Sequence, residues 1–290
     1  MEFKTIGLFG HMYSQDIRET VSSVCAFLKT KGCRVILESN LAESLGTIDV
    51  EVATKDTMGD SIDLALVIGG DGTLLSTARS MVQYQVHLLG INRGHLGFLT
   101  DIRPTEIGQK LEEILDGKFT MEQRFLLETN IRHGDATQSG HGLNEIVLSA
   151  QGAHHLIQYE IYVDKQFVCR QRADGLIIAT PTGSTAYALS GGGPIIHPEL
   201  NALTLVPMFP HTLSMRPIVI NGDSTILLRV QDNLNTQIQI SCDSQTFFQV
   251  NSESEIEVKK KKESITLIHP TNYSYYKSLR SKLHWGSKLI

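Results

Sequence analysis

The stretch LALVIGGDGTLLSTARSMV (residues 64–82) decides the fold class of this 290-residue chain. Leu64–Ile68 is a continuous apolar run, as expected of a strand buried inside a parallel sheet. Gly69 and Gly70 end that strand, and Leu74–Val82 then has the apolar spacing of a helix. A buried strand that leads through a glycine turn into a helix is the repeating unit of α/β proteins.

The same alternation of strands and helices extends to both sides of this stretch. Further strands are expected at Lys4–Phe9, Arg34–Leu37 and His87–Ile91, and further helices at Asp16–Thr30 and Pro104–Leu115. We therefore predict an α/β domain over residues 1–118, with a parallel sheet and helices on both of its faces.

The character of the sequence changes after about residue 118. Short β-like runs separated by Gly, Asn, Asp and Pro turns predict an all-β domain over residues 119–270. The expected strands are Phe125–Ile131, Ile146–Ser149, Leu156–Val163, Leu176–Ala179, Ile218–Ile220, Thr225–Val230, Gln237–Ile240, Glu255–Val258 and Ile265–Ile268. Gly183–Ser190 has a helical pattern. The basic run Lys259–Lys262 is flanked by glutamates and is expected to form a solvated turn between two strands.

Composition and charge argue against several classes of function. The chain is 41% apolar and 20% charged, and its net charge of −5 gives no sequence-wide basic footprint for nucleic acid. The first residues lack the features of a signal peptide, and no stretch approaches the length needed to cross a bilayer, so we expect no membrane partner. Four scattered cysteines without CxxC spacing disfavour disulfides and zinc. Together these features indicate a reducing, cytoplasmic compartment.

The loop Gly69-Gly70-Asp71-Gly72-Thr73 is the strongest functional motif. Its glycines expose backbone N–H groups, and the following helix adds the positive end of its dipole, so the loop suits a phosphate. It is neither a Walker A loop nor a dinucleotide fingerprint. A carboxylate beside phosphates costs electrostatic energy, so we expect Asp71 to take a proton from an attacking hydroxyl or to position a metal. The alternative is that Asp71 only stabilises the turn or caps the helix.

Two further groups of residues carry polar chemistry. Asn144 and Glu145, at the start of a β run, suit a ribose or the edge of an adenine. Arg172-Ala173-Asp174 leads into ATPTGSTAYALSGGGP (residues 179–194), whose hydroxyls and small residues allow a polar ligand to approach closely. Tyr187 offers a flat face for a base. Core packing of Tyr187 and a plain N-cap turn at Thr182–Thr185 are the structural alternatives.

The motifs GGDGT, Asn144-Glu145 and DGLIIATPTGSTAYALSGGGP (residues 174–194), in this order, resemble those of the NAD kinase family. GGDGT alone also occurs in diacylglycerol and sphingosine kinases and, with variation, in 6-phosphofructokinases. The resemblance covers nearly the whole chain and is most like the enzymes of Gram-negative bacteria. It extends through INRGHLGFLTDI (91–102), LVPMFPHTLSMRPIVI (205–220), SCDSQ (241–245) and SYYKSLRSKLHWGSKLI (274–290).

The resemblance implies transfer of the γ-phosphoryl group of ATP to the 2′-hydroxyl of the adenosine ribose of NAD. Asp71 would be the general base and, with Gly72, would contact the ribose of the substrate. Gly69, Gly70, Gly72 and Thr73 would hold the ATP triphosphate together with a divalent metal, Mg²⁺ first among them. No protein side chain is assigned to that metal.

The resemblance also implies which residues bind NAD. Asn144 and Glu145 would hold the adenosine ribose region. Asp174 and the segment Thr185–Ser190 would bind the nicotinamide half and the second adenine pocket. The individual positions implied in that segment are Thr185, Ala186, Tyr187 and Ser190. Further NAD contacts are implied at Arg172, at Gln245 and at His155, the last from a neighbouring subunit.

The resemblance further implies that residues 271–290 return to the α/β domain and that the active site forms between domains at subunit contacts of a homotetramer or homodimer. The sequence disfavours three other functions. A lipid kinase is disfavoured because no basic amphipathic helix is present. A binding module without chemistry is disfavoured because Asp71 is retained. A Rossmann dehydrogenase is disfavoured because Phe9-Gly10-His11-Met12 lacks the glycine fingerprint.

Overall fold

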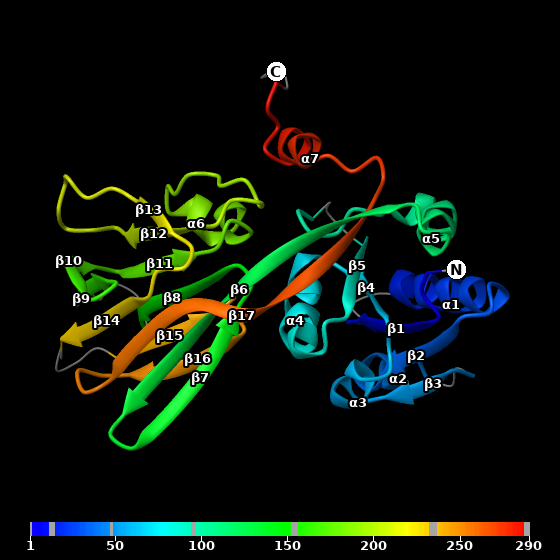
Figure 1. Cartoon of the computed structure of the whole chain (residues 1–290), viewed down its shortest axis with the longest axis horizontal. Coiled ribbons are helices and arrows are strands. Elements are labelled where there is room, and N and C mark those ends of the chain that lie inside the picture. Colours follow the sequence, from blue (N-terminus) through cyan, green and yellow to red (C-terminus); the bar gives the residue numbers. More distant parts are fainter. Residues whose placement is uncertain are drawn as a thin grey trace. The chain divides into compact units, whose positions relative to one another are not determined.

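The computed structural model describes residues 2–11, 15–46, 49–93, 97–151, 156–231 and 237–286. The chain divides into two compact units, one formed by Met1–Gln123 with Ile265–Ile290 and the other by Arg124–Ser264. As Figure 1 shows, the chain enters the second unit within strand β6 (Phe119–His133) and leaves it within strand β17 (Glu255–Pro270).

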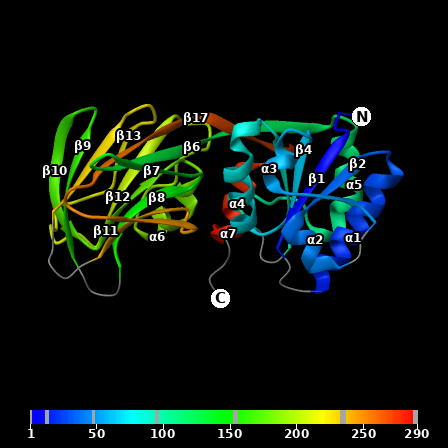
Figure 2. The same cartoon turned by 90° about the horizontal axis from the view of Figure 1, so that it is seen from below.

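The first unit is a parallel sheet covered by helices, which Figure 2 shows around strands β1, β2 and β4. The strand order is β17-β5-β4-β1-β2-β3, and each neighbouring pair is parallel. The remaining bounds are β1 Thr5–Gly10, α1 Gln15–Thr30, β2 Arg34–Glu38, α2 Ser39–Leu45, β3 Glu51–Ala53, α3 Lys55–Gly59, β4 Leu64–Gly69, α4 Asp71–Met81, η1 Val82–Tyr84, β5 His87–Asn92, η2 Pro104–Glu106, α5 Ile107–Leu115 and α7 Tyr275–Lys282. The strand order reverses between β1 and β4, and α/β proteins bind their ligands at such a switch point.

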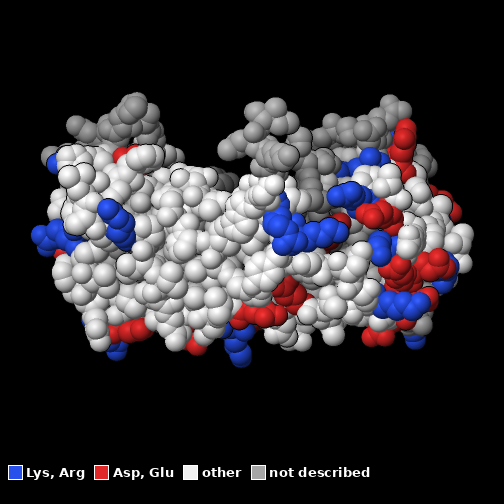
Figure 3. Space-filling view, turned by 90° about the horizontal axis from the view of Figure 1, so that it is seen from above, with Lys and Arg blue, Asp and Glu red and all other residues white. Residues whose placement is uncertain are grey.

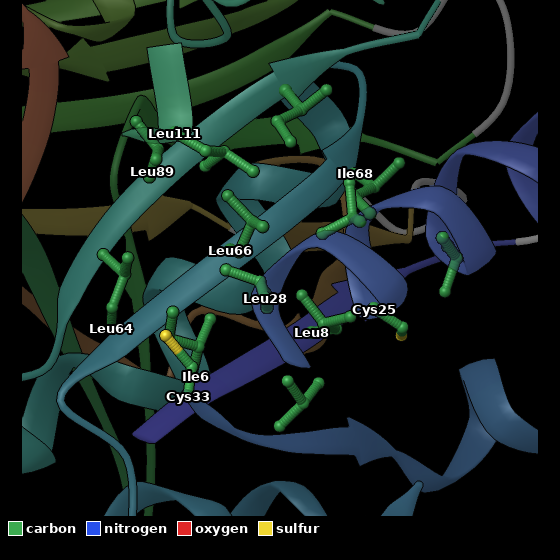
Figure 4. Packing of buried hydrophobic residues seen from close by; sticks show 14 of the residues in the cluster. Ile6, Leu8, Cys25, Leu28, Cys33, Leu64, Leu66, Ile68, Leu89 and Leu111 are labelled. Carbon is green, nitrogen blue, oxygen red and sulfur yellow. The ribbon is translucent and has the colours of Figure 1, made fainter. Parts of the chain in front are cut away.

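The central strands of the first unit are buried on both faces, because they are almost continuously apolar. Ile6 of β1 and Leu66 of β4 pack on one face with Leu28 of α1 (Figure 4), and each such side chain contributes about 1.5–3 kcal/mol by its burial. On the opposite face, β1 passes close to α3. A Cβ added to Gly7 would lie 2.8 Å from the Met58 methyl group, so a larger residue there would have to displace that flexible side chain.

The second unit consists of β-sheets. One sheet has the order β13-β12-β11-β8-β15-β16, and the second-unit strands of the other have the order β10-β9-β14-β17, with β6 beside β17 and β7 beside β6. The bounds are β7 Ala136–Gly142, β8 Glu145–Ala150, β9 Ile157–Val163, β10 Gln166–Ala173, β11 Gly175–Ala179, η3 Gly183–Thr185, α6 Tyr187–Ser190, β12 Ala202–Met208, β13 Ile218–Asn221, β14 Ile226–Gln231, β15 Ile238–Cys242 and β16 Thr246–Val250. Leu148 and Ile161 belong to the core that the sheets share, and Tyr159 Oη donates to the Gly175 carbonyl at 3.0 Å.

The predicted fold class is confirmed, since helices flank a parallel sheet in the first unit and strands dominate the second. The sequence patterns do not predict the short elements α2, β3 and α3, nor strands β7, β10, β12 and β16. The helix predicted over Gly183–Ser190 is interrupted at Ala186, where φ is −104° and ψ is −128°, so it divides into η3 and α6.

The prediction that Lys259–Lys262 forms a turn is wrong. The run lies inside β17, which is one continuous strand. Lys260 Nζ lies 3.3 Å from an Asp223 carboxylate oxygen, and Lys261 Nζ lies 2.8 Å from Glu263. Carboxylates beside the run balance the positive charge, so an extended backbone is compatible with these lysines.

Candidate active site

The glycine loop lies at the carboxyl end of β4, beside the switch in strand order. β4 ends at Gly69, and α4 begins at Asp71. The Gly70 carbonyl accepts a hydrogen bond from the Thr73 N–H at 3.1 Å, so the helix starts without any intervening loop. The positive end of the α4 dipole therefore falls within the motif, which is the arrangement that favours a bound anion.

The three glycines of the motif differ in whether the protein's own packing requires glycine. A Cβ on Gly69 would lie 2.7 Å from Thr73 Oγ1, so close packing requires glycine at that position. A Cβ on Gly70 or on Gly72 would have no other atom within 4 Å, and neither residue has a positive φ. Nothing in the protein's own packing requires glycine at these two positions. An incoming ligand that packs on the backbone would require it.

The Asp71 carboxylate makes no capping hydrogen bond at the start of α4, so the alternative that it caps this helix is wrong. One carboxylate oxygen accepts a hydrogen bond from the Phe98 N–H (2.6 Å), and the other accepts one from the Leu99 N–H (3.0 Å). A Cβ on Gly97 would lie 1.8 Å from Asp71 Oδ1, so only glycine allows this contact. The Thr100 hydroxyl also donates to the carboxylate, at 3.4 Å. An ionised carboxylate has about four acceptor positions, so about one is left for a substrate hydroxyl.

In the second unit, the loop that carries Asn144 and Glu145 is held from two sides. The Asp243 carboxylate accepts hydrogen bonds from the N–H groups of Leu143 (2.8 Å), Asn144 (2.8 Å) and Glu145 (3.1 Å). On the other side, the Thr180 N–H donates to the Asn144 carbonyl at 2.9 Å. Charge-assisted bonds of the first kind are the stronger ones, so Asp243 fixes the backbone of this loop.

Asp243 is a site residue that the sequence analysis does not identify. It is buried, and its backbone is in the left-handed region, with φ of 50°, in the turn between β15 and β16. An aspartate between two β runs is a turn signal, but the loop it bonds lies about a hundred residues earlier. Gln245, a predicted site residue, lies in the same turn, where its N–H donates to the Cys242 carbonyl.

Glu145 is a buried carboxylic acid at the start of β8. Its burial, together with the negative charge of Asp243, raises the pKa of Glu145 to about 8, although a hydrogen bond with the Tyr187 backbone opposes the shift. Its Oε2 atom has no hydrogen-bond partner among the described residues. Leaving such an atom unpaired costs about 1–3 kcal/mol.

The turn before α6 packs directly on this loop. A Cβ on Gly183 would lie 2.0 Å from the Asn144 carbonyl oxygen, so glycine is required for the approach. Tyr187 is 42% exposed and is therefore not the core residue of the structural alternative. The structure thus brings together Asn144, Glu145, Thr185, Ala186 and Tyr187, with Ser190 exposed at the end of α6.

Arg172 and Asp174 are not part of this group. In the pairing of β11 with β8, Gly175 lies opposite Ser149 and Ala179 opposite Glu145. Asp174 therefore lies at one end of β11 and the Asn144–Glu145 loop at the other, roughly 15 Å away at the rise of a strand. His155 lies outside the described residues.

Comparisons with known proteins agree with this architecture. The family model of the ATP-NAD kinase N-terminal domain matches residues 6–119, and that of the ATP-NAD kinase C-terminal domain matches residues 143–270. The chain is 47% identical to an NAD kinase of Pseudomonas putida and 48% identical to one of Pseudomonas syringae. Each match covers 99% of this chain and 98% of the relative.

Two solved structures share the fold. Yeast NADH kinase complexed with NADH superposes with a TM-score of 0.90 at 24% identity, covering 100% of this chain and 89% of the other. An NAD kinase from Archaeoglobus fulgidus in complex with ATP gives 0.73 at 23% identity, covering 97% of each chain. Because both family models match in order and the identity to the Pseudomonas enzymes extends over the full length, the chain belongs to the NAD kinase family.

Proposed function

We propose that this chain transfers the γ-phosphoryl group of ATP to the 2′-hydroxyl of the adenosine ribose of NAD, giving NADP and ADP. The observation that carries the proposal is the open space above Gly70 and Gly72, next to the Asp71 carboxylate at the carboxyl end of β4. The family to which the chain belongs bears the name of this reaction.

The ATP triphosphate binds over Gly70 and Gly72, where backbone and helix dipole favour negative charge. Among the described residues, no group of three or more His, Cys, Asp or Glu side chains is placed to hold a metal ion. A divalent cation, Mg²⁺, would enter with the nucleotide substrate and would neutralise part of the charge of its phosphates.

Asp71 acts as the general base. It takes the proton of the 2′-hydroxyl while the oxygen forms a bond to the γ-phosphorus and the bond to the β,γ-bridging oxygen breaks, so that ADP leaves with the electron pair. A general base contributes roughly 10²–10⁴ in rate. Positioning of the two substrates and neutralisation of phosphate charge supply the larger share.

Asn144 and Glu145 bind the adenosine ribose region of NAD. A Glu145 carboxyl with a raised pKa is protonated at neutral pH, so it both donates to one ribose hydroxyl and accepts from another. Thr185–Ser190 and Gln245 supply further contacts from the same group. Asp174 contacts the nicotinamide half of NAD, and Arg172 supplies a further NAD contact. His155 acts from a neighbouring subunit of a homodimer or homotetramer.

We further propose that the protein acts in the cytoplasm and binds no nucleic acid. No disulfide joins any of the four cysteines, all of which lie in the described part of the chain, as a reducing compartment would keep them. Acidic and basic side chains are interspersed on the face in Figure 3, without a continuous basic surface there. No helix among the described residues is both long enough and apolar enough to cross a bilayer.

The proposal is tested by incubating the purified chain with NAD, ATP and Mg²⁺ and detecting NADP with an NADP-specific dehydrogenase. NADP should accumulate, and chelation of the metal should stop its formation. A parallel reaction offers diacylglycerol in place of NAD. Absence of NADP, together with phosphorylation of the lipid, would replace this function with that of a lipid kinase.

A further inference from the structure

The C-terminal helix of the first unit carries a lysine to the region of the glycine loop. Ser274 caps the start of helix α7, because its Oγ accepts from the Lys277 N–H at 3.4 Å, and the buried Leu279 anchors the helix. Its last residue is Lys282. The Lys282 ammonium nitrogen lies 4.4 Å from the centroid of the Phe98 ring, within range of a cation–π contact.

Phe98 connects this ammonium group to the proposed base. The Phe98 N–H donates to Asp71 at 2.6 Å, so the residue under the lysine is also the residue that orients Asp71. Lys282 is half-buried, and its burial lowers its pKa, whereas the charges of Asp71 and Asp101 act in the opposite direction. The ammonium group therefore lies within electrostatic range of Asp71.

No ion pair compensates this ammonium group among the described residues, because neither aspartate bonds to it. Other lysines of the first unit do have such partners: Lys31 pairs with Glu112, and Lys110 with Glu113 at 2.7 Å. Taking a cation partly out of water without an anionic partner is unfavourable. A ligand with several negative charges at the glycine loop would remove this penalty.

We propose that Lys282 binds the triphosphate of ATP and neutralises charge at the phosphoryl group being transferred. Lysine is a common phosphate ligand because its ammonium group is a compact point charge with three donors. The inference rests on the proposed function, since it needs a triphosphate at Gly70 and Gly72. It adds a residue of the C-terminal helix, far along the chain, to the ATP site. The competing explanation is that Lys282 only fastens α7 to Phe98.

Two variants and one control on the same helix separate these explanations. Lys282→Met keeps the apolar stem and removes the charge, and Lys282→Arg keeps the charge. Lys277→Met is the control, because Lys277 is exposed one turn and a half earlier. Initial rates would be measured against ATP at saturating NAD, and NAD binding by calorimetry.

Loss of a charge-assisted contact should lower kcat/KM for ATP in Lys282→Met about tenfold or more, with NAD affinity unchanged. Lys282→Arg should recover much of that loss, and Lys277→Met should behave as wild type. A Lys282→Met variant whose kcat/KM for ATP stays within about twofold of wild type would overturn the inference. If that variant is unaffected while both it and the wild type form NADP, the inference about Lys282 fails but the proposed function stands.

A second measurement does not depend on the folding of a variant. The wild-type chain is acetylated briefly with N-hydroxysuccinimidyl acetate, and the lysines are read by peptide mass spectrometry. A non-hydrolysable ATP analogue with Mg²⁺ should slow modification of Lys282, whereas NAD alone should not, and Lys277 should react equally in all samples. Equal modification of Lys282 with and without the nucleotide would refute the contact.

Discussion

The substitution Gly72→Ala separates the demands of folding from those of ATP binding. Gly72 is the second residue of α4, it is exposed, and an added Cβ would have no other atom within 4 Å. Its φ is not positive, so alanine is unstrained there. If the triphosphate packs on this backbone, the new methyl group occupies the space that a phosphate oxygen needs.

The two effects have opposite signs. Replacing glycine with alanine in a helix stabilises it by up to about 1 kcal/mol, which would raise the Tm by about 2–4 °C in a protein of this size class. Loss of one charge-assisted phosphate contact costs about 1.5–3 kcal/mol, which corresponds to a fall of roughly 10- to 100-fold in kcat/KM for ATP.

The assay compares Gly72→Ala with Gly108→Ala. Gly108 is also the second residue of its helix, α5, is also exposed, and also has no atom within 4 Å of an added Cβ. Both variants should keep or raise the Tm in thermal melts, and only Gly72→Ala should lose activity. If Gly72→Ala turned over ATP with wild-type kcat/KM, no phosphate would pack on Gly72 and the proposed ATP site would be wrong.

Three further predictions concern carboxylates and a histidine. Asp71→Asn should lower kcat about 10²-fold or more, because the amide cannot act as a general base. It should also lower the Tm, because the amide NH₂ group would face backbone N–H groups that now donate to the carboxylate. Near-normal turnover would refute the role of Asp71 as general base. In Asp243→Asn the asparagine tolerates the φ of 50°, but it has fewer acceptors for the N–H groups of the Asn144–Glu145 loop. Calorimetry should therefore show weaker NAD binding, and an unchanged Kd would contradict this. Burial lowers the pKa of His269, but hydrogen bonds to Asp101 and Glu122 raise it by more, so the net shift is upward. The stability it adds is therefore present below about pH 6.5 and lost as pH rises through the raised pKa. In His269→Gln the Tm should fall less steeply as the pH rises. A fall as steep as in the wild type would show that the contacts of His269 with Asp101 and Glu122 do not cause it.

Much of the fold is predictable because the apolar periods are strong. The strand Leu64–Ile68 and the helix after it are predictable, since every residue of that strand is buried and the helix has one apolar face. Strand β3 has only three residues, largely exposed, so no period of two can develop in it. The run Lys259–Lys262 misleads because only some of its partners are the flanking glutamates, whereas Asp223 and Glu128 belong to other parts of the chain.

The candidate site follows the same division. The glycine loop is predictable because strand, loop and helix are contiguous, so local sequence specifies the anion site. The hydrogen-bond partners of Asp71 and of Asn144 are not predictable from the sequence. Phe98 and Asp243 are distant from them in the chain and act through backbone or turn geometry. A turn aspartate or an aromatic residue after a glycine does not by itself indicate which loop it will hold.

The most direct test of the central claim follows the transferred group itself. The chain is incubated with NAD, Mg²⁺ and ATP labelled in the γ-phosphoryl group, and the dinucleotide product is isolated and its phosphate position determined by ³¹P NMR. We expect label on the 2′-oxygen of the adenosine ribose, in an amount equal to the ADP formed. Label found only in inorganic phosphate, or on any other hydroxyl of the dinucleotide, would contradict it.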